Sequence, residues 1–380
     1  MTCEYAHLKF KCPGCSLWGI SYGQQLIDKS IYLKTLFPEL KEHEVKTHSA
    51  GEYQLRHRFD FIIKNSKIGL IGKNYDESSG SSLTEKYFIE INKCLQLAPE
   101  LQGALELLKN IPIPISLGSL RLRYSSLNKE FKYGIWLDFS NEDIKKLLQE
   151  KTTLIELSKQ FFIEVGQKKK TLDPSTFSSP QIKLAEPKPQ HWFYTKDSSN
   201  LNIPLNCAVS SFTQPSPETA SLITSIILNW LSTSSTQNIW EFGCGIGQYT
   251  FPILSLKKKV SVFENDKFAL ECLERTAKEN NYLEKLTIYP GDFQNHAPDI
   301  DEKPQVILVN PPKSGLKQFT NTIIKNQPQK IIYVSCYPDS LKLDAEIFLQ
   351  NDYKISEAHI VDQFPQTKHF EVVMLFEIST

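Results

Sequence analysis

Four cysteines have a spacing that suits a metal ion or a metal cluster. Cys3, Cys12 and Cys15 crowd the first fifteen residues, and Cys94 stands alone. Four thiolates are common ligands of zinc and of iron–sulfur clusters, and spacing by itself does not distinguish these two. Eight cysteines in 380 residues are too few for a disulfide scaffold, so a reducing compartment is expected.

A glycine-rich turn supplies a second candidate site. Glu241-Phe-Gly-Cys-Gly-Ile-Gly247 follows a predicted strand and opens a predicted helix, and such glycines let a backbone approach a ligand closely. Glu264 ends the next strand, where it can accept hydrogen bonds from ribose hydroxyls, and Asp292 after the third strand can meet an adenine edge. The three acids favour cationic S-adenosylmethionine over a dinucleotide, because they tolerate a sulfonium and repel a pyrophosphate.

Three further segments carry reactive side chains at the ends of later strands. They are Val309-Asn-Pro-Pro-Lys-Ser-Gly315, Tyr333-Val-Ser-Cys-Tyr-Pro338 and Phe364-Pro-Gln-Thr-Lys-His-Phe-Glu371. Ligands and reactive groups collect at this edge of open α/β sheets. Together with Ser211-Phe-Thr-Gln214 and the glycine turn, these ordered segments resemble the RNA uracil-C5 methyltransferase family over nearly the whole C-terminal half.

The resemblance implies a covalent mechanism that is chemically sound. Uracil C5 is too weak a nucleophile to take a methyl group unaided, but a thiolate that adds at C6 makes C5 nucleophilic. Cys336 is the implied thiolate, and Glu371 is the implied base that removes the C5 proton so that the cysteine can leave. The expected enzyme is therefore an RNA (uracil-5-)-methyltransferase that uses S-adenosylmethionine.

The sequence departs from the usual family motifs at two places. Gly243 stands where relatives usually have an aromatic residue, and Lys313 replaces an arginine whose planar fork of donors it lacks. Asn310, in place of the more common aspartate, resembles the branch that acts on large-subunit ribosomal RNA. With Asp292 added, the expected donor-binding residues are Gln214, Gly243, Glu264, Asn310 and Asp292.

The cysteines resemble those of the iron–sulfur branch of this family, which modifies a loop uridine of 23S ribosomal RNA. The resemblance thus implies a [4Fe-4S] cluster on Cys3, Cys12, Cys15 and Cys94. A structural role, fastening the N-terminus to its domain, is the simpler expectation. A redox role is less expected, because methyl transfer through a cysteine requires no electron transfer.

Basic side chains beside aromatic ones are the candidate RNA contacts. Arg56 and Arg58 open a predicted strand near Tyr53 and Phe59, and His369 lies in the C-terminal motif. A solvated charged face is the alternative interpretation of each basic segment. The target uridine must leave its stack to be attacked, so a loop or bulge is expected as the substrate. The family resemblance implies that this loop belongs to 23S RNA, before or during ribosome assembly.

Two regions must position these residues. Residues 1–200 carry 28 Lys and Arg against 23 Asp and Glu, and they predict an α+β RNA-binding domain with the cysteine cluster and without an OB-like domain. Residues 201–380 carry 15 against 20, and their alternation of helix and strand predicts a Rossmann-like, doubly wound α/β methyltransferase domain. The net charge of the whole chain is zero because the excess positive charge of the first region cancels the excess negative charge of the second.

Hydrophobic periodicity predicts the individual elements. In the first region it predicts helices over 24–37, 99–110 and 141–160, and strands over 58–63, 67–71, 121–124 and 132–138. In the second it predicts helices over 217–231 and 267–280, and strands over 238–242, 259–263, 286–289, 305–309 and 330–334. The second set alternates as parallel βαβ units do.

The remaining sequence features limit the class of protein. No signal segment and no apolar run of membrane-spanning length is present, so a cytoplasmic enzyme without membrane association or obligate protein partner is expected. Three alternatives stay open. They are a tRNA T-loop uracil-C5 methyltransferase, a catalytically inactive RNA-binding assembly factor of the same fold, and an amino-group methyltransferase that uses Asn310-Pro-Pro.

Overall fold

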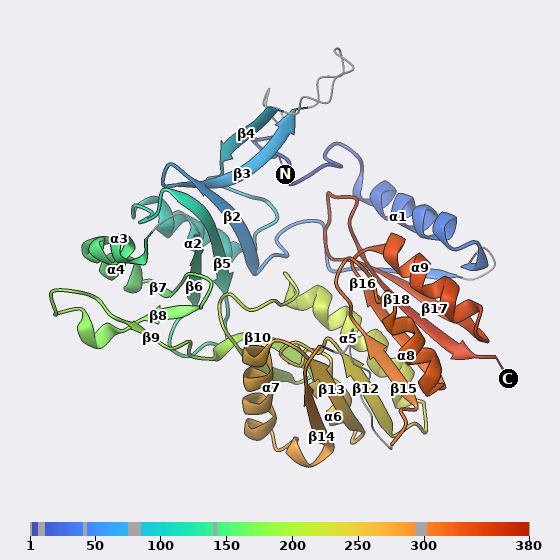
Figure 1. Ribbon diagram of the computed structural model, residues 1–380. Helices are drawn as coiled ribbons and strands as arrows, with labels where there is room; N and C mark the ends of the chain where they lie inside the picture. The colour runs from blue at the N-terminus through green and yellow to red at the C-terminus, as the bar shows by residue number, and fades with distance from the viewer. Residues whose placement is uncertain are drawn as a thin grey trace. The chain divides into compact units, whose positions relative to one another are not determined.

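A computed structural model of the chain describes residues 2–6, 12–40, 44–74, 85–139, 143–292 and 302–379. The chain forms two compact units, each with its own eight-stranded sheet (Figure 1). The N-terminal unit comprises Met1–Trp18, Gly51–Trp192 and Cys207–Ser211. The C-terminal unit comprises Gly19–Ala50, Phe193–Asn206 and Phe212–Thr380.

The chain passes between the units several times, not once near residue 200. Gly19–Ala50 belongs to the C-terminal unit, although the expected division assigned it to the first region. This segment contains α1 (Tyr22–Leu36) and β1 (Val45–Ser49), and β1 pairs in parallel with β17 (Tyr353–Asp362). Pairing between strands so far apart in the chain leaves no trace in local composition, which is why a boundary drawn from composition missed it.

The sheet of the N-terminal unit is mostly antiparallel. Its strand order is β4-β3-β2-β5-β6-β7-β8-β9, and only β6 and β7 form a parallel pair. The predicted turn at Asn65 and Ser66 joins β2 to β3 with left-handed φ angles of 52° and 57°, as a two-residue hairpin requires. The strands are β2 (Arg58–Lys64), β3 (Lys67–Asn74), β4 (Glu85–Glu90), β5 (Leu117–Tyr124), β6 (Tyr133–Asp138), β7 (Phe161–Val165), β8 (Lys170–Leu172) and β9 (Leu184–Ala185).

Helices of the N-terminal unit contribute leucines to its core. Helix α2 (Pro99–Lys109) has a proline in its first turn and buries Leu101, Leu105 and Leu108. The single helix expected over 141–160 is instead two helices, α3 (Ile144–Gln149) and α4 (Lys151–Ser158), and residues 140–142 lie outside the described residues. A short 3-10 turn, η2 (Pro174–Thr176), follows β8.

The sheet of the C-terminal unit has the order β1-β17-β18-β16-β15-β12-β13-β14. Five of its strands are mutually parallel, as expected, and β12 lies between β13 and β15. Such a reversal of strand order opens a crevice at the carboxyl edge, where ligands bind. The parallel strands are β12 (Asn238–Phe242), β13 (Lys259–Glu264), β14 (Leu286–Pro290), β15 (Val306–Val309) and β16 (Lys330–Ser335).

One strand runs against the parallel direction expected for this sheet. Strand β18 (Glu371–Ile378) is antiparallel to both of its neighbours, β16 and β17. It follows β17 after a connection of residues 363–370, which is too short for the crossover that a parallel pair needs. The carboxyl end of β16 and the amino end of β18 therefore meet at the same edge.

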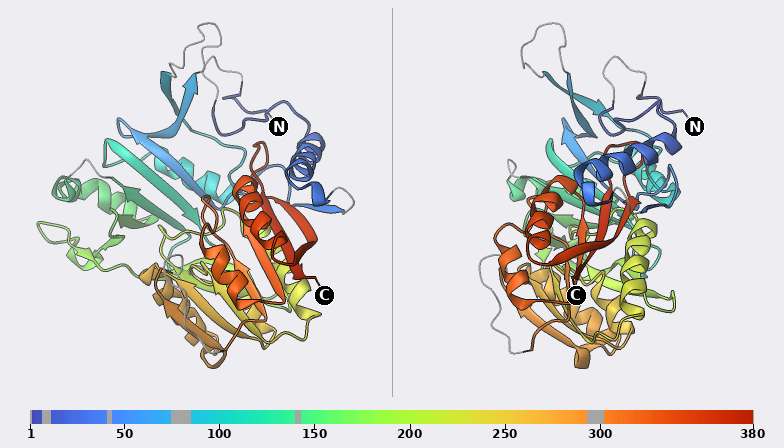
Figure 2. Two further views of the ribbon diagram at one scale, coloured as in Figure 1. Left: turned by 45° about the vertical axis from the view of Figure 1, so that its right-hand side comes forward. Right: turned by 90° about the vertical axis from the view of Figure 1, so that its right-hand side faces the viewer.

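Helices cover both faces of the C-terminal sheet, which confirms the predicted doubly wound α/β fold. In the right-hand view of Figure 2, α8 (Phe319–Asn326) and α9 (Pro338–Leu349) lie on one side and α5 (Pro217–Ser232) on the other. Within the described residues, no helix is both long enough and apolar enough to cross a membrane. The remaining elements are α6 (Thr250–Ser255), α7 (Lys267–Glu279), η1 (Pro38–Leu40), η3 (Leu283–Lys285) and the paired β10 (Gln190–Lys196) and β11 (Asn202–Cys207).

Helix α1 buries a partly polar face. Gln25, Lys29 and Leu33, spaced one turn apart, are buried, whereas Ile27 and Ile31 are exposed. The helix lies beside α9 in both figures. Apolar spacing correctly predicted this helix but not its packing face, because Gln25 and Lys29 find polar partners in the segment after β17 and at the end of β17.

Candidate active site

The turn between β12 and α6 holds three glycines in conformations that other residues rarely adopt. Gly243, Gly245 and Gly247 have φ angles of 73°, 55° and 90°. A Cβ atom on Gly243 would lie 3.1 Å from the carbonyl oxygen of Asn310, and one on Gly247 would lie 2.5 Å from Cε2 of Phe251. The turn therefore favours glycine at these positions. Without side chains there, a ligand can approach the backbone closely at the carboxyl edge of the sheet.

Glu264, the expected ribose-binding residue, closes the same turn. Its Oε2 accepts a hydrogen bond from the backbone nitrogen of Gly245 at 2.9 Å. Its Oε1 accepts from the backbone nitrogens of Asn265 and Asp266 at 2.8 and 2.9 Å. A carboxylate has about four acceptor positions, so Glu264 can hold the turn and still accept from one ligand hydroxyl.

Glu241 has a different role from the one expected of it. Its carboxyl group is buried, and the hydroxyl of Thr250 donates to its Oε2 at 2.7 Å. Burial raises the pKa of Glu241 to about 8, so the group is mostly protonated at neutral pH. Glu241 therefore ties β12 to α6, and Glu264 and Asp292 are left to supply the negative charge near the turn.

The surroundings of the glycine turn fit S-adenosylmethionine. Nε2 of Gln248, the residue after the last glycine, is buried and has no hydrogen-bond partner within the described part of the chain. Asp292 is exposed two residues beyond β14, and Asn310 follows β15 beside Gly243. A buried amide that lacks a partner suits a ligand with polar ends. Sequence reasoning missed Gln248, whose only signal is its place after Gly247.

Phe242 belongs to the core and not to the ligand side of the turn. Its buried ring stacks on Phe263, with ring centroids 4.3 Å apart, and packs edge-to-face on Phe319 at 4.6 Å. Phe242 therefore does not replace the aromatic residue that is missing at Gly243.

Cys336 and Glu371 meet at the edge shared by two neighbouring strands. Cys336 directly follows β16, Glu371 is the first residue of β18, and the antiparallel register pairs Ser335 with Val372. Cys336 and Glu371 each adjoin this last residue pair, and the charge of Glu371 acts on the Cys336 thiol. Burial raises the pKa of the half-buried Cys336 thiol, and the charge of Glu371 raises it further.

Lys313 is the cation that acts on both reactive groups. Its ammonium group lowers the pKa of Cys336 and of Glu371, although burial has the larger effect on each. The net result is a pKa of about 7 for Glu371. A thiolate and a carboxylate close together repel each other, so Lys313 favours their ionised forms. Sequence reasoning noted Lys313 only as a replacement for arginine.

The loop that carries Lys313 is anchored to α9. Oδ2 of Asp344 accepts hydrogen bonds from the backbone nitrogen of Leu316 at 2.7 Å and from the hydroxyl of Tyr333 at 2.6 Å. Gly315 has a φ angle of 73°, and a Cβ atom there would lie 2.8 Å from the same carboxylate oxygen. The Pro-Pro-Lys-Ser-Gly motif therefore ends in glycine because Asp344 packs against it.

Glu371 also belongs to a buried hydrogen-bond network. Nε2 of Gln363 donates to Oε1 of Glu371 at 3.1 Å and to Oε1 of Gln214 at 2.5 Å. Gln214 donates to the hydroxyl of Tyr249 at 3.4 Å, and the hydroxyl of Thr219 donates to Oε1 of Gln363 at 3.0 Å. All five side chains are buried. The network links an expected donor contact to the expected base, and no sequence motif had indicated Gln363 or Tyr249.

The four candidate metal ligands all belong to the N-terminal unit. Burial raises the pKa of Cys15 to about 12, and the thiols of Cys94, Cys12 and Cys3 also raise it. Thiols that influence one another lie close together. In the described ranges, however, no group of three or more His, Cys, Asp or Glu side chains has the geometry to hold a metal ion. The structure thus gathers the cysteines without supporting the expected metal site.

Hydrogen bonds tie the N-terminal cysteines to the segment around Cys94. The hydroxyl of Tyr5 accepts from the backbone nitrogen of Asn92 at 2.8 Å, and the carbonyl of Tyr5 accepts from the nitrogen of Cys12 at 3.2 Å. The nitrogen of Cys94 donates to Oε1 of Gln102 in α2 at 3.0 Å. These bonds hold Tyr5 and Cys12 close to the segment that precedes Cys94.

The three expected RNA contacts differ in exposure. His369 is exposed, and its ring packs edge-to-face against Phe364 with centroids 6.5 Å apart. Arg56 is half-buried over the ring of Phe59 at 5.3 Å, and its charge lowers the pKa of Cys15 and Cys94.

Arg58, like Arg56, is partly buried within the N-terminal unit. It is half-buried on β2, opposite Arg123 in the register of β2 and β5. Burial lowers the pKa of Arg58, and the neighbouring guanidinium groups of Arg121 and Arg123 act in the same direction. Arg56 and Arg58 therefore serve the packing of the N-terminal unit, and their contact with RNA stays a prediction.

Comparison with known proteins adds two family matches. Residues 299–378 match the family model described as tRNA (Uracil-5-)-methyltransferase. Residues 216–331 match the model described as Methyltransferase small domain. The first match includes Asn310, Cys336 and Glu371, and the second includes the glycine turn.

Similar proteins cover nearly the whole chain. An uncharacterized RNA methyltransferase of Bdellovibrio bacteriovorus is 35% identical, and the match covers 99% of this chain and 95% of that protein. The 23S rRNA (uracil(1939)-C(5))-methyltransferase RlmD of Mannheimia succiniciproducens is 26% identical over 99% of this chain and 81% of its own. The solved tRNA (uracil-54, C5)-methyltransferase of Pyrococcus abyssi, in complex with S-adenosyl-L-homocysteine, shares the fold with a TM-score of 0.68 at 19% identity, covering 96% of this chain and 86% of that one.

Proposed function

The chain belongs to the RNA uracil-C5 methyltransferase family, and we propose that it forms 5-methyluridine in 23S ribosomal RNA through a covalent bond between Cys336 and uracil C6. One observation carries this mechanism. Cys336 and Glu371 adjoin the last residue pair of β16 and β18, and the charge of Lys313 acts on both. A nucleophile and a base at one edge of a methyltransferase sheet are what the reaction requires.

Cys336 acts first in the proposed reaction. Its thiolate attacks C6, and the electrons of the C5–C6 double bond move to form an enolate that is nucleophilic at C5. Lys313 favours the thiolate because it lowers the pKa of Cys336. S-adenosylmethionine supplies the methyl group that C5 takes.

Glu371 completes the reaction. Its carboxylate removes the proton from C5, the electrons of that C–H bond restore the C5–C6 double bond, and the C6–S bond breaks to release the Cys336 thiolate. With a pKa of about 7, Glu371 is ionised in about half of the molecules at neutral pH. A general base works best when its pKa is near the working pH, because it must be ionised before the step and must hold the proton after it.

We assign the methyl donor to the glycine turn and RNA contacts to basic residues of both units. The bare backbone at Gly243 and the buried amide of Gln248 support the donor assignment. The proposed donor-binding residues are Gln214, Gly243, Glu264, Asp292 and Asn310, with Gln248 added. The proposed RNA contacts are Arg56, Arg58 and His369, of which the exposed His369 has the strongest support.

Trapping with 5-fluorouridine tests the covalent step. RNA that carries 5-fluorouridine has no C5 proton to lose, so Cys336 should stay bonded to it and the protein should migrate as an RNA adduct on a denaturing gel. Cys336→Ala should lose the adduct and all methylation. Cys272→Ala, at a buried cysteine of α7, is the matched control and should keep both. Equal trapping by Cys336→Ala would refute the assignment of the nucleophile.

The choice of 23S RNA is supported by the named 23S methyltransferases among the relatives. A tRNA T-loop substrate is the alternative, because the solved structure that shares the fold carries the name of a tRNA enzyme. Mapping 5-methyluridine in cells that lack the gene separates the two. A uridine lost from 23S RNA supports the proposal, loss from tRNA alone contradicts it, and loss from neither indicates an inactive assembly factor.

We further propose that Cys3, Cys12, Cys15 and Cys94 bind a [4Fe-4S] cluster with a structural role. The mutual influence of their thiols and the hydrogen bonds around Tyr5 support it. The four thiolates of an iron–sulfur cluster lie farther apart than the four ligands of one metal ion, so the lack of a single-ion site in the described residues does not contradict a cluster. The positive charge of Arg56 lowers the pKa of Cys15 and Cys94 and so favours their thiolates. Anaerobically purified protein should contain iron and sulfide, which Cys94→Ser should lose, whereas stoichiometric zinc without iron would contradict the cluster.

A further inference from the structure

Gln363 is the side chain through which the base contacts the rest of the active site. It is fully buried, and it makes three hydrogen bonds, two with side chains around the start of α5 and one with Glu371. Its amide nitrogen donates to Glu371 and Gln214, and its amide oxygen accepts from Thr219. Among the described residues, no other side chain donates a hydrogen bond to the carboxyl group of Glu371.

The partners of Gln363 define which way its amide points. Thr219 presents a hydroxyl that can donate, whereas Glu371 and Gln214 both present oxygens. An amide turned the other way would set its oxygen against the ionised carboxylate of Glu371, which can only accept a hydrogen bond. The nitrogen must therefore face Glu371, and Oε1 of Glu371 is the oxygen that it occupies.

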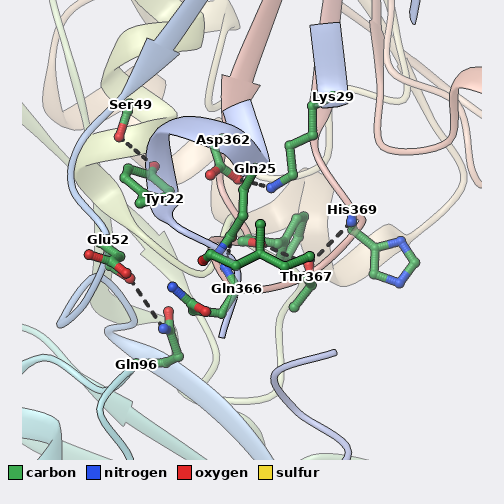
Figure 3. Close-up of polar contacts among 12 residues, drawn as sticks. Tyr22, Gln25, Lys29, Ser49, Glu52, Gln96, Asp362, Gln366, Thr367 and His369 are labelled. Carbon is green, nitrogen blue, oxygen red and sulfur yellow. Dashed lines mark hydrogen bonds and ion pairs between the residues drawn. The ribbon is translucent and has the colours of Figure 1, made fainter. Parts of the chain in front are cut away.

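Helix α1 holds the backbone on both sides of Gln363. Lys29 donates to Oδ1 of Asp362 at 2.7 Å, and both side chains are buried. Oε1 of Gln25 accepts from the backbone nitrogen of Gln366 at 3.0 Å. Figure 3 shows Lys29 and Gln25 reaching from α1 toward these two neighbours of Gln363. The segment between β17 and β18 is thus fastened at two points around the amide.

We propose, on the basis of the proposed function, that Gln363 is a positioning residue for proton removal, which holds Oε1 of Glu371 so that Oε2 takes the proton from C5. Lys313 acts on Glu371 through its charge alone and, in the described residues, donates no hydrogen bond to it, so the task of holding Oε1 falls on Gln363. Because Gln363 also holds Gln214, it keeps the base in a constant position relative to an expected donor contact. The role concerns the step after methyl transfer and not the transfer itself.

Loss of the Gln363 amide should slow removal of the C5 proton and change the pH dependence of that step. Burial already raises the pKa of Glu371 to about 7, Lys313 lowers it, and Cys336 and Tyr249 are the other titratable groups that interact with it. Removing a donor from a carboxylate disfavours the ionised form. The pH at which product release is half-maximal should therefore move upward in a variant without the amide.

Single-turnover kinetics of Gln363→Met tests the role. The substrate is RNA purified from cells that lack the gene, with radiolabelled methyl groups on S-adenosylmethionine, and gels separate methylated adduct from released RNA. The variant should form methylated adduct within about twofold of the parent rate, release it about tenfold more slowly, and show the upward shift in pH. Gln350→Met, at an exposed glutamine after α9, should match the parent.

Thr219→Val keeps the inference testable if Gln363→Met folds poorly. It removes the hydroxyl that orients the amide but retains Gln363, so release should slow by a smaller factor with the same direction of pH shift. Release at the parent rate and pH in both variants would overturn the inference while leaving the proposed function intact. If the parent itself forms no methylated adduct, the proposed function fails first, and the inference falls with it.

Discussion

Glu371 is buried in the free protein although its reaction needs it ionised. Below the ordinary carboxyl pKa of 4.5 it is neutral in both folded and unfolded chains. As the pH rises through 4.5 toward about 7, the unfolded chain ionises first, so the folded state loses stability. A catalytic carboxyl group in this position therefore lowers the free energy of unfolding at neutral and alkaline pH.

Glu371→Gln should consequently stabilise the fold in a pH-dependent way. At pH 8 the variant should exceed the parent by about 3 kcal/mol in the free energy of unfolding, because a neutral amide avoids the burial of a charge. At pH 4.5 the difference should be small. Urea unfolding at both pH values measures it, with Glu271→Gln at an exposed position of α7 as the control. The same difference at both pH values would contradict the assigned cause.

Lys313 should control the pH at which the thiol reacts. Lys313→Met removes the charge that lowers the pKa of Cys336, so adduct formation with 5-fluorouridine RNA should slow by about tenfold at pH 7 and recover at higher pH. Lys313→Arg retains the charge and should keep most of the parent rate. A loss that alkaline pH does not recover would indicate that Lys313 acts on RNA binding and not on the thiol.

Helix α1 shows how one element supports a site on another part of the chain. Its buried Lys29 pairs with Asp362, and Oδ2 of that aspartate is buried without a hydrogen-bond partner in the described residues. A buried ion pair of this kind has a large desolvation cost, and removing one partner leaves the other charge buried and unpaired. The helix is therefore coupled to the segment that carries Gln363.

Lys29→Met should destabilise the protein by about 3 to 5 kcal/mol, because it leaves the charge of Asp362 buried without its partner. The double variant Lys29→Met with Asp362→Leu should regain a large part of this loss. Urea unfolding measures both. The control is Lys46→Met, whose exposed pair with Glu357 should cost less than about 1 kcal/mol. Equal losses for Lys29→Met and Lys46→Met would contradict the importance of burial.

The path of the chain makes the two halves of the sequence dependent on each other. Gly19–Ala50 supplies the edge strand β1 and the helix α1 of the C-terminal unit. Without it, β17 becomes an exposed edge of the sheet, and such edges favour aggregation. A boundary at residue 200 therefore does not yield an independent methyltransferase domain.

Fragment expression tests this dependence. Residues 201–380 alone should aggregate, or should melt well below the full chain, because β17 and Asp362 lose their partners. A fusion of residues 19–50 through a flexible linker to residues 193–380 restores both partners and should melt in one cooperative transition. Light scattering and thermal unfolding distinguish the two. A monomeric fragment 201–380 with the melting temperature of the fusion would contradict the prediction.

Local sequence was enough to predict most elements and the reactive residues themselves. Short apolar runs between turns predicted the parallel strands from β12 to β16, and the glycine triplet predicted the ligand-side turn. Cys336 and Glu371 came from short motifs whose residue types suit the chemistry of uracil. These signals are local because a strand, a turn and a motif each depend on neighbouring residues.

Long-range pairing decided how those residues can work. The antiparallel pairing of β16 with β18 brings Glu371 near Cys336, and the partners of Gln363 come from segments that no motif connects. Burial, too, depends on distant segments, which is why Glu241 and Arg58 differ from their expected roles. A sequence records which groups are present, but hydrogen bonding and desolvation depend on which groups the fold brings together.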